Sequence, residues 1–375
     1  MTENKHFPKK IENLELALHK TRNLLSITDK ILASKTLAVS DDAWLDELIA
    51  WADENGIQEY SYVKDYGWIG FPRNKQELLA ITVLDLFNNA LTELPELIGK
   101  LSNLKTLNLM GNSLTKIPES ISLLSNLTKL NLHDNRLNEL PEFIGKMKNL
   151  TSLDISFNPF IKIPVFICML PNLTELNLGG IYEIPEFIGK MSKLTSLEIY
   201  SKEIPEFVGK MHNLISLSIE NNQITEIPIF IGNLHNLNKL NFTASLTKIP
   251  DFIENLSNLT ELRFSFNKFT SISKSIGNLS KLTILELDCN QLTELPESII
   301  KLTNLAVLNL SRNQLTKIPD LNTNLEELDL SLNQFRTIPK SIDKLTKLTK
   351  LDLRWNPIKS LPPELSHLKN ITYFN

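Results

Sequence analysis

Histidine and cysteine are the residues of this chain whose side chains best suit acid–base, nucleophilic or metal chemistry. Its six histidines are His6, His19, His133, His212, His235 and His367, and no two of them are four residues apart. Two histidines at that spacing on a helix are a common basis of a zinc site. The two cysteines form no C-x-x-C pair, and the chain has no G-x-S-x-G or phosphate-binding glycine loop. The sequence therefore predicts that the protein is not an enzyme and carries no metal or cofactor.

A repeat that begins at Ile81 positions most other polar residues. Its template is L-x-x-L-x-L-x-x-N-x-L-x-x-I/L-P-x-x-I-x-x-L-x-x, and thirteen copies follow one another. Nine copies have 23 residues, and the other four have 20 to 22. A fixed period in this range, built on leucine and asparagine, indicates a solenoid in which each copy forms one coil. We number the copies as repeats 1 to 13; they begin at Ile81, Leu104, Leu127, Leu150, Leu173, Leu194, Leu214, Leu237, Leu259, Leu282, Leu305, Leu325 and Leu348.

Each repeat predicts a short strand followed by a helical turn. The segment L-x-x-L-x-L alternates apolar and polar residues, as a half-buried strand does, so that Leu107 points inward and Asn108 outward. Proline then ends any regular element, as at Pro118, and the following Ile-x-x-Leu spacing suits a helical or 3-10 turn. One coil buries too little apolar surface to offset the entropy of ordering it, so coils are stable only when stacked. The sequence thus predicts an α/β solenoid with a parallel sheet on its concave wall.

An asparagine follows the strand in most repeats, where the chain turns away from the sheet. We expect its amide to be buried and to hydrogen-bond backbone groups of its own turn and of the neighbouring turn. Leaving a buried amide without a partner costs about 1–3 kcal/mol. We call this series the asparagine ladder; its residues are Asn89, Asn112, Asn135, Asn158, Asn222, Asn267, Asn290, Asn313, Asn333 and Asn356.

The strand residues that point outward form a candidate binding surface on the concave wall. The outward position between the second and third leucines is acidic in six of thirteen repeats and basic in one. Aromatic side chains among carboxylates are typical of protein-binding surfaces, in which aromatics anchor the partner and charges select it. The alternative is that such repeats tolerate any soluble residue at these positions. The candidate partner-binding residues are Phe87, Met110, Phe157, Glu198, Tyr200, Glu220, Phe266, Glu286, Leu332 and Trp355.

Repeats 5, 6 and 8 are shortened between the strand and the proline, by two, three and one residues, and lack the ladder asparagine. We expect the shortening to make a notch in one rim of the solenoid. Neutral drift and a partner site are both open as explanations. The residues expected at the notch are Gly180, Tyr182, Glu198, Tyr200 and Ser201.

Residues 1–80 precede the repeats and predict a helical cap over the first coil. Apolar residues recur at helical spacing through Ile11–Ser34, and a second helix is expected to begin after Ser40, a favourable N-cap. This second helix would end near Gly56 and present on one face Trp44, Leu48 and Trp51. Pro72 and Leu78 match the second half of a degenerate repeat. A separate helical module that binds a partner is the alternative.

The predicted domain layout follows from these patterns. Residues 1–80 form the cap with its half-repeat, residues 81–370 form the thirteen repeats, and residues 371–375 form a terminal half-strand. Within the repeats, Cys168 is expected to be a small packing residue on the convex side. Cys289 is expected to point outward beside Asn290, with no histidine at the equivalent position of the adjacent repeats. The N-x-S/T sequons, such as that at Asn126, are explained by the repeat itself rather than by glycosylation.

Charge and hydropathy bear on location and partner class. The formal net charge is −4, and an acidic concave wall would repel phosphates, so we expect no nucleic-acid partner. No apolar stretch is long enough to span a membrane, and the N-terminus lacks the apolar core of a signal peptide. We therefore expect a cytoplasmic protein. A secreted effector without a classical signal peptide is the alternative.

These residues and their spacing resemble the leucine-rich-repeat superfamily. The second half of the template, I/L-P-x-x-I-x-x-L, is similar to that of the 23-residue intracellular subclass, which includes plant Ras-group proteins and many bacterial proteins. The resemblance implies a right-handed superhelical horseshoe with a concave parallel sheet and protein ligands on the concave face, so that the protein acts as a scaffold or regulator. Bacterial ubiquitin-ligase effectors join similar repeats to a catalytic domain with a nucleophilic cysteine. Neither cysteine here lies outside the repeats, so we expect no ligase activity. The alternative is that the chain is the binding portion of a truncated ubiquitin-ligase-type enzyme. Oligomeric state and partner identity are not predicted.

Overall fold

The computed structural model describes residues 42–63, 67–181, 183–221, 223–359 and 371–372. The chain divides into two units, Met1–Glu47 and Leu48–Asn375. In the first unit, the described residues belong to the beginning of helix α2 (Ala43–Glu54). The second unit contains the repeats and the candidate site. The helix expected over Ile11–Ser34 and the N-cap expected at Ser40 lie outside the described residues.

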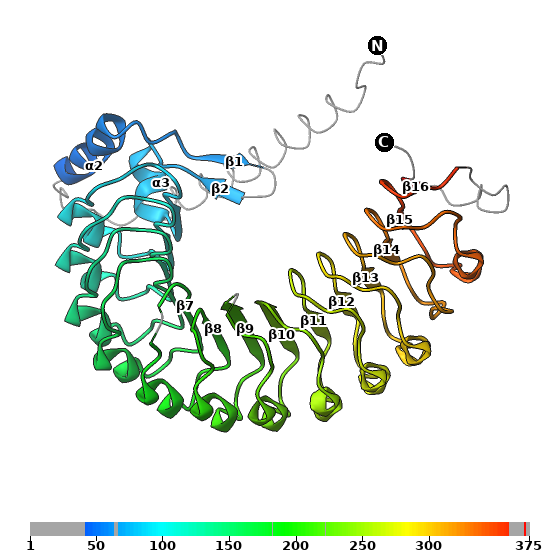
Figure 1. Cartoon of the computed structure of the whole chain (residues 1–375). Coiled ribbons are helices and arrows are strands. Elements are labelled where there is room, and N and C mark those ends of the chain that lie inside the picture. Colours follow the sequence, from blue (N-terminus) through cyan, green and yellow to red (C-terminus); the bar gives the residue numbers. More distant parts are fainter. Residues whose placement is uncertain (1–41, 64–66, 182, 222, 360–370, 373–375) are drawn as a thin grey trace, which may run out of the picture. The chain divides into compact units, whose positions relative to one another are not determined.

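In the described ranges, the repeats and the segment after them build one parallel sheet of fourteen strands, each hydrogen-bonded to the next strand in sequence. Strands line the inner side of the array (Figure 1). The middle residue of every three-residue strand of this sheet is a buried leucine. It pairs with the equivalent leucine of the next strand, as Leu107 does with Leu130, except that Leu351 pairs with Ile371. The strands are β3 (Val83–Asp85), β4 (Thr106–Asn108), β5 (Lys129–Asn131), β6 (Ser152–Asp154), β7 (Glu175–Leu178), β8 (Ser196–Ile199), β9 (Ser216–Asn221), β10 (Lys239–Ala244), β11 (Glu261–Arg263), β12 (Ile284–Glu286), β13 (Val307–Asn309), β14 (Glu327–Asp329), β15 (Lys350–Asp352) and β16 (Ile371–Thr372).

Short 3-10 helices lie on the outer, convex side (Figure 1). In nearly every case a proline with extended backbone precedes the helix, and the central Ile or Val is buried. Proline suits this position because it has no N–H to leave unpaired and its φ is already fixed. The helices are η1 (Glu96–Lys100), η2 (Glu119–Leu123), η3 (Glu142–Lys146), η4 (Val165–Met169), η5 (Glu186–Lys190), η6 (Glu206–Lys210), η7 (Ile229–Asn233), η8 (Asp251–Asn255), η9 (Lys274–Asn278), η10 (Glu297–Lys301) and η11 (Lys340–Lys344).

The core fills the space between the sheet and the 3-10 helices. It consists of leucine and isoleucine side chains that recur at the same positions of each coil. In repeats 8 and 9 three phenylalanines take their places, with ring centroids of Phe242 and Phe264 5.9 Å apart and those of Phe264 and Phe269 5.8 Å apart. Each coil therefore shares its apolar face with its two neighbours, as the stacking argument requires.

In repeats 5 to 8, which include the three shortened repeats, the strands are longer than in the other repeats described. β7 and β8 have four residues, and β9 and β10 have six, so backbone that forms a loop in other repeats pairs with a neighbouring strand here. Ser201, expected at a notch, is buried. Tyr182 lies outside the described residues. Repeat 11 is shortened on the convex side instead, where residues 320–324 form no helix and Asn322 is buried.

Residues 43–80 form the N-terminal elements that precede the sheet. The apolar face of α2 was predicted in part: Leu48 is buried as expected, together with Leu45 and Ala52, whereas Trp44 and Trp51 are half-buried. Helical spacing fits both sets, and the indole rings are too large to be enclosed fully at this edge. The helix ends at Glu54, close to Gly56 as expected, and Gly56 has a φ of 64°.

A hairpin that the sequence did not predict follows α2. β1 (Ser61–Val63) pairs antiparallel with β2 (Gly67–Ile69), and the Gly70 N–H donates to the Asp85 carbonyl of β3 at 3.0 Å. Arg73 holds this segment, because its guanidinium donates to the Phe71 and Ile57 carbonyls at 2.7 and 2.6 Å. Helix α3 (Lys75–Ala80) then begins at an asparagine N-cap and contributes the buried Leu78.

Candidate functional site

The asparagine ladder lies beneath the loops that follow the strands. Nδ2 of Asn135 donates to the carbonyls of Leu109 and Leu132 at 2.9 and 3.1 Å, and its Oδ1 accepts from the Leu114 N–H at 3.0 Å. One side chain therefore joins two consecutive coils through backbone groups of both. The same geometry recurs at the buried residues Asn112, Asn158, Asn267, Asn290, Asn313 and Asn333.

The two ends and the middle of the ladder differ from this pattern. Asn89 and Asn356 are half-buried at the ends of the array. Asn222 lies outside the described residues, and its neighbour Asn221 is buried, with Oδ1 2.8 Å from the Gln223 nitrogen. In repeats 6 and 8, small buried serines stand near the ladder position, Ser201 and Ser245. A smaller side chain fits there because the loop is shorter and the strand longer.

A second series of inter-repeat bonds, missed by the sequence analysis, follows the opposite ends of the strands. The asparagine that ends one repeat donates to a carbonyl of the preceding repeat, as Asn126 does to Ser102 at 2.9 Å. Two residues later a threonine hydroxyl does the same, as Thr128 does to Lys105 at 3.0 Å. Asn-Leu-Thr is therefore a structural motif of the coil, which accounts for the sequons. Its recurrence in register was the signal that could have revealed this role.

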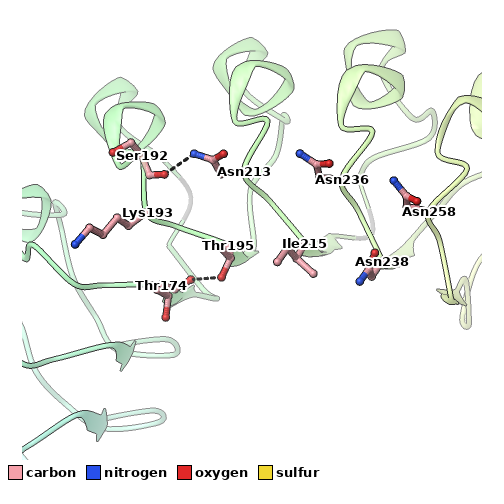
Figure 2. Close-up of a pocket in the computed structure, with 9 residues that line it drawn as sticks. All are labelled: Thr174, Ser192, Lys193, Thr195, Asn213, Ile215, Asn236, Asn238 and Asn258. Carbon is pink, nitrogen blue, oxygen red and sulfur yellow. Dashed lines mark hydrogen bonds between the residues drawn. The ribbon is translucent and has the colours of Figure 1, made fainter.

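The hollow shown in Figure 2 lies along this second series, at repeats 5 to 8. It has a volume of about 540 Å³ and is lined by threonine, serine and asparagine together with Ile215, and Lys193 is its one charged residue. Several lining side chains already bond to neighbouring coils: Thr195 donates to the Thr174 carbonyl, and Asn213 to that of Ser192. Its side chains thus serve coil stacking, and no acid–base pair lines it.

The concave face carries the outward strand residues, and the structure brings the acidic ones into rows. At the N-terminal end, Asn108 Nδ2 donates to Asp85 Oδ1 at 3.0 Å, and a hollow of about 300 Å³ lies over β3 to β6. At the C-terminal end the acids have cationic partners, since Arg263 lies 2.5 Å from Glu286 and Arg354 lies 2.5 Å from Asp352. Of the candidate residues here, Glu198, Tyr200, Glu220 and Glu286 are half-buried, and so are Phe87, Met110 and Leu332.

Exposed aromatic side chains border this face where the strands end. Phe157, Phe266 and Trp355 are 45%, 63% and 60% exposed. Each immediately precedes a ladder asparagine and has a positive φ of 51 to 60°, a region that favours glycine and asparagine. Gly111 occupies the equivalent position of repeat 2. A bulky residue in this conformation costs on the order of 1–3 kcal/mol. Arg312 and Leu332 occupy the same position of other repeats, with φ of 54° and 52°.

Comparison with protein families decides the identity of the coils. The description "Leucine rich repeat" matches residues 80–137, 280–322 and 320–358. "Leucine Rich repeats (2 copies)" matches residues 125–168, and "Leucine Rich Repeat" matches residues 213–234 and 258–279. The chain belongs to the leucine-rich-repeat family. The fold expected from the sequence, a leucine-rich-repeat solenoid with a concave parallel sheet, is therefore confirmed.

Solved leucine-rich-repeat structures resemble the chain over most of its length. A protein of Leptospira interrogans is 31% identical, with 74% of this chain and 79% of that chain covered and a TM-score of 0.60. An internalin of Listeria monocytogenes is 26% identical, with coverage of 89% and 94% and a TM-score of 0.62. A TDR receptor is 27% identical, with coverage of 79% and 59% and a TM-score of 0.55. No curated protein matched the chain.

Three acidic side chains interact electrostatically in the middle of the leucine-rich-repeat sheet. The pKa of Glu198 is raised to about 7, first by burial and then by the nearby carboxylates of Glu220 and Asp154, whereas a hydrogen bond with Asn177 opposes the change. Asn177 also donates to Asp154 at 3.1 Å, so one amide serves two acids. This part of the concave face therefore holds negative charge that the neighbouring side chains only partly stabilise.

The raised pKa of Glu198 makes stability depend on pH. A carboxyl with a higher pKa in the folded state contributes stability below its unfolded value of 4.5 and loses it as pH rises through about 7. Relative to the native protein, we expect the free energy of unfolding of Glu198→Gln to be about 1 kcal/mol higher at pH 8 than at pH 5. This figure allows for the water around the half-buried group. Urea unfolding at both pH values measures it. Glu286→Gln is the control, and an equal change in both variants would refute the assignment.

The two cysteines and the other metal-binding residue types form no reactive centre in the part of the chain that is described. Burial and the neighbouring Asp288 raise the pKa of the Cys289 thiol, which disfavours the thiolate needed of a nucleophile. Cys168 is exposed in η4, so its predicted packing role was wrong: the helix turns Ile167 inward instead. Within the described ranges, no three histidine, cysteine or acidic side chains gather to hold a metal, and no helix is long and apolar enough to cross a membrane.

Proposed function

We propose that this leucine-rich-repeat chain binds a protein ligand on its concave face and acts as a scaffold or regulator rather than as an enzyme. The observation that carries the proposal is that three exposed aromatic residues, in repeats 4, 9 and 13, have left-handed backbone conformation where their strands end. Folding alone favours glycine or asparagine there, whereas a binding surface gains anchors. The family and the receptor and internalin relatives support the same class of function.

The middle of the concave face supports a ligand with basic side chains. The carboxylates of Glu220 and Asp154 lie close enough to raise the pKa of Glu198. A lysine or arginine of the ligand would relieve that repulsion, and the energy gained would favour a basic partner over an acidic one. His133 and Phe157 provide an apolar contact beside the acids, with ring centroids 5.0 Å apart.

Capture from a lysate tests the proposal with a charge-reversed variant. We expect Glu198→Lys/Glu220→Lys/Glu286→Lys to lose the native protein's specific preys almost completely, because like charges then face the basic ligand. The matched control is Glu93→Lys/Glu139→Lys/Glu294→Lys, which changes the net charge equally at exposed positions outside the strands. The proposal fails if both variants lose the same preys or if neither does.

A second variant separates binding from folding. Phe266→Gly removes one anchor and also relieves a backbone conformation that suits glycine. We expect its unfolding midpoint to be unchanged or higher while capture of the same preys falls. Equal capture by the native protein and the variant would exclude Phe266 from the binding surface.

A further inference from the structure

An apolar patch lies on the convex side of repeat 4, away from the concave face. Ile161, Val165 and Met169 are 86%, 64% and 69% exposed, and Cys168 beside them is also exposed. The neighbouring repeats are polar at the equivalent positions of their 3-10 helices. η3 and η5 both read EFIGK, whereas η4 reads VFICM. Repeat 4 thus exposes apolar side chains at the positions where repeats 3 and 5 expose glutamate and lysine.

The helices around the patch form two rows of opposite charge. The first residue of the helix is an exposed glutamate in η1, η2, η3, η5 and η6, and the last is an exposed lysine in η1, η3, η5 and η6. Four residues of 3-10 helix separate the two rows by about 8 Å. The apolar side chains of η4 interrupt both rows, and Leu123 of η2 extends the patch along the lysine row with 64% exposure.

This arrangement is complementary to itself when it is turned around. A two-fold axis parallel to the rows brings repeat 4 opposite repeat 4 and reverses each helix, so that Val165 meets Met169 of a second molecule. The same rotation places each glutamate row against a lysine row, with Glu142 opposite Lys146 and Glu186 opposite Lys190. We propose that a second copy of this chain covers the patch and forms a two-fold dimer through the convex side of repeats 3 to 6.

The surrounding charges favour a second copy over an unrelated partner. A ligand of one charge would be attracted by one row and repelled by the other, whereas an identical surface satisfies both rows at once. The intramolecular alternative is weak: Glu206 and Lys210 of η6 lie 3.6 Å apart with both side chains largely exposed. Two convex surfaces diverge, so we expect a small interface, below about 1,200 Å², and a concentration-dependent dimer. The concave faces stay open, and the dimer does not depend on the proposed ligand.

Sedimentation velocity across about 1 to 500 µM tests the dimer. The decisive variant is Val165→Lys/Cys168→Gly/Met169→Lys, which sets lysine against lysine across the two-fold axis. It is expected to fold, because η11 carries lysine at the same two helix positions and η3 and η5 carry glycine at the fourth. We expect it to raise the dissociation constant at least about a hundredfold. The matched control is Ile229→Glu. Ile229 is 77% exposed at the first position of η7, in repeat 7 and thus outside the proposed interface, so the dimer of this variant should be unchanged.

Two charge variants test the orientation. Glu142→Lys places lysine opposite Lys146 of the second copy, and we expect it to weaken the dimer about tenfold. Adding Lys146→Glu restores opposite charges across the axis and should recover most of the loss, as it would not for an unrelated partner. A native protein that stays monomeric over the whole range, or a dimer that the triple variant leaves intact, overturns the proposal.

Discussion

Replacing Asn290 by alanine is expected to lower the free energy of unfolding by about 2–4 kcal/mol, because several buried backbone groups lose their partner at once. Its Nδ2 lies 2.9 and 3.1 Å from the carbonyl oxygens of Phe264 and Leu287, and its Oδ1 lies 3.1 Å from the Phe269 nitrogen. Water cannot replace the amide easily, since the side chain is only 8% exposed. The shift of the urea midpoint measures the loss, and hydrogen exchange at the Phe269 amide locates it.

Asn304→Ala is the matched control for this prediction. Asn304 also bonds to the preceding coil, with Nδ2 2.7 Å from the Ser280 carbonyl oxygen, but it is exposed. Water can take over that bond, so we expect a loss of less than about 1 kcal/mol. Equal losses for the two variants would contradict the view that burial, rather than the number of inter-repeat bonds, gives the ladder its strength.

Gly99→Ala is expected to destabilise the junction of repeats 1 and 2 by about 2–3 kcal/mol through overpacking. A Cβ at Gly99 would lie 2.3 Å from the Ser120 carbonyl oxygen and 2.6 Å from its Cβ. The obstacle is backbone of the next 3-10 helix, so η1 and η2 must move apart to admit one methyl group. The urea midpoint reports the cost, and increased hydrogen exchange is expected at η1 and η2 first.

Ser122→Ala controls for the position within the helix. Ser122 occupies the equivalent place in η2, where an exposed side chain is already present. We expect a change within about 0.5 kcal/mol. If Gly99→Ala is equally mild, the contact between the first two helices is looser than the structure shows, and glycine there has no packing role.

Leucine periodicity was enough to predict the sheet, because the same inward positions recur in every coil. Leu107, Leu130 and Leu153 are all buried, and they pair in the register that the alternating pattern implies. The ladder asparagines could be placed for the same reason. Their chemistry needs a buried turn, and the sequence offers one site of that kind in each repeat.

Features that depend on neighbouring coils were harder to predict. Cys168 was predicted to pack in the core because small side chains often do. It is exposed, because Ile167, the residue before it in η4, is the one that faces the core. The hairpin β1–β2 escaped because each strand has only three residues, too few to show alternation. The left-handed conformation of Phe157 and Phe266 could not be read from residue type, since the frame of the coil imposes it.

Strand order in the main sheet follows chain order throughout, from β3 to β16. Every strand of the sheet therefore pairs only with the strand before it and the strand after it. Tandem duplication of a whole 23-residue unit would lengthen the surface by one strand and leave all distant junctions as they were. The length of the concave surface is thus a trait that gene-level recombination can adjust in single steps, without redesign of the interior.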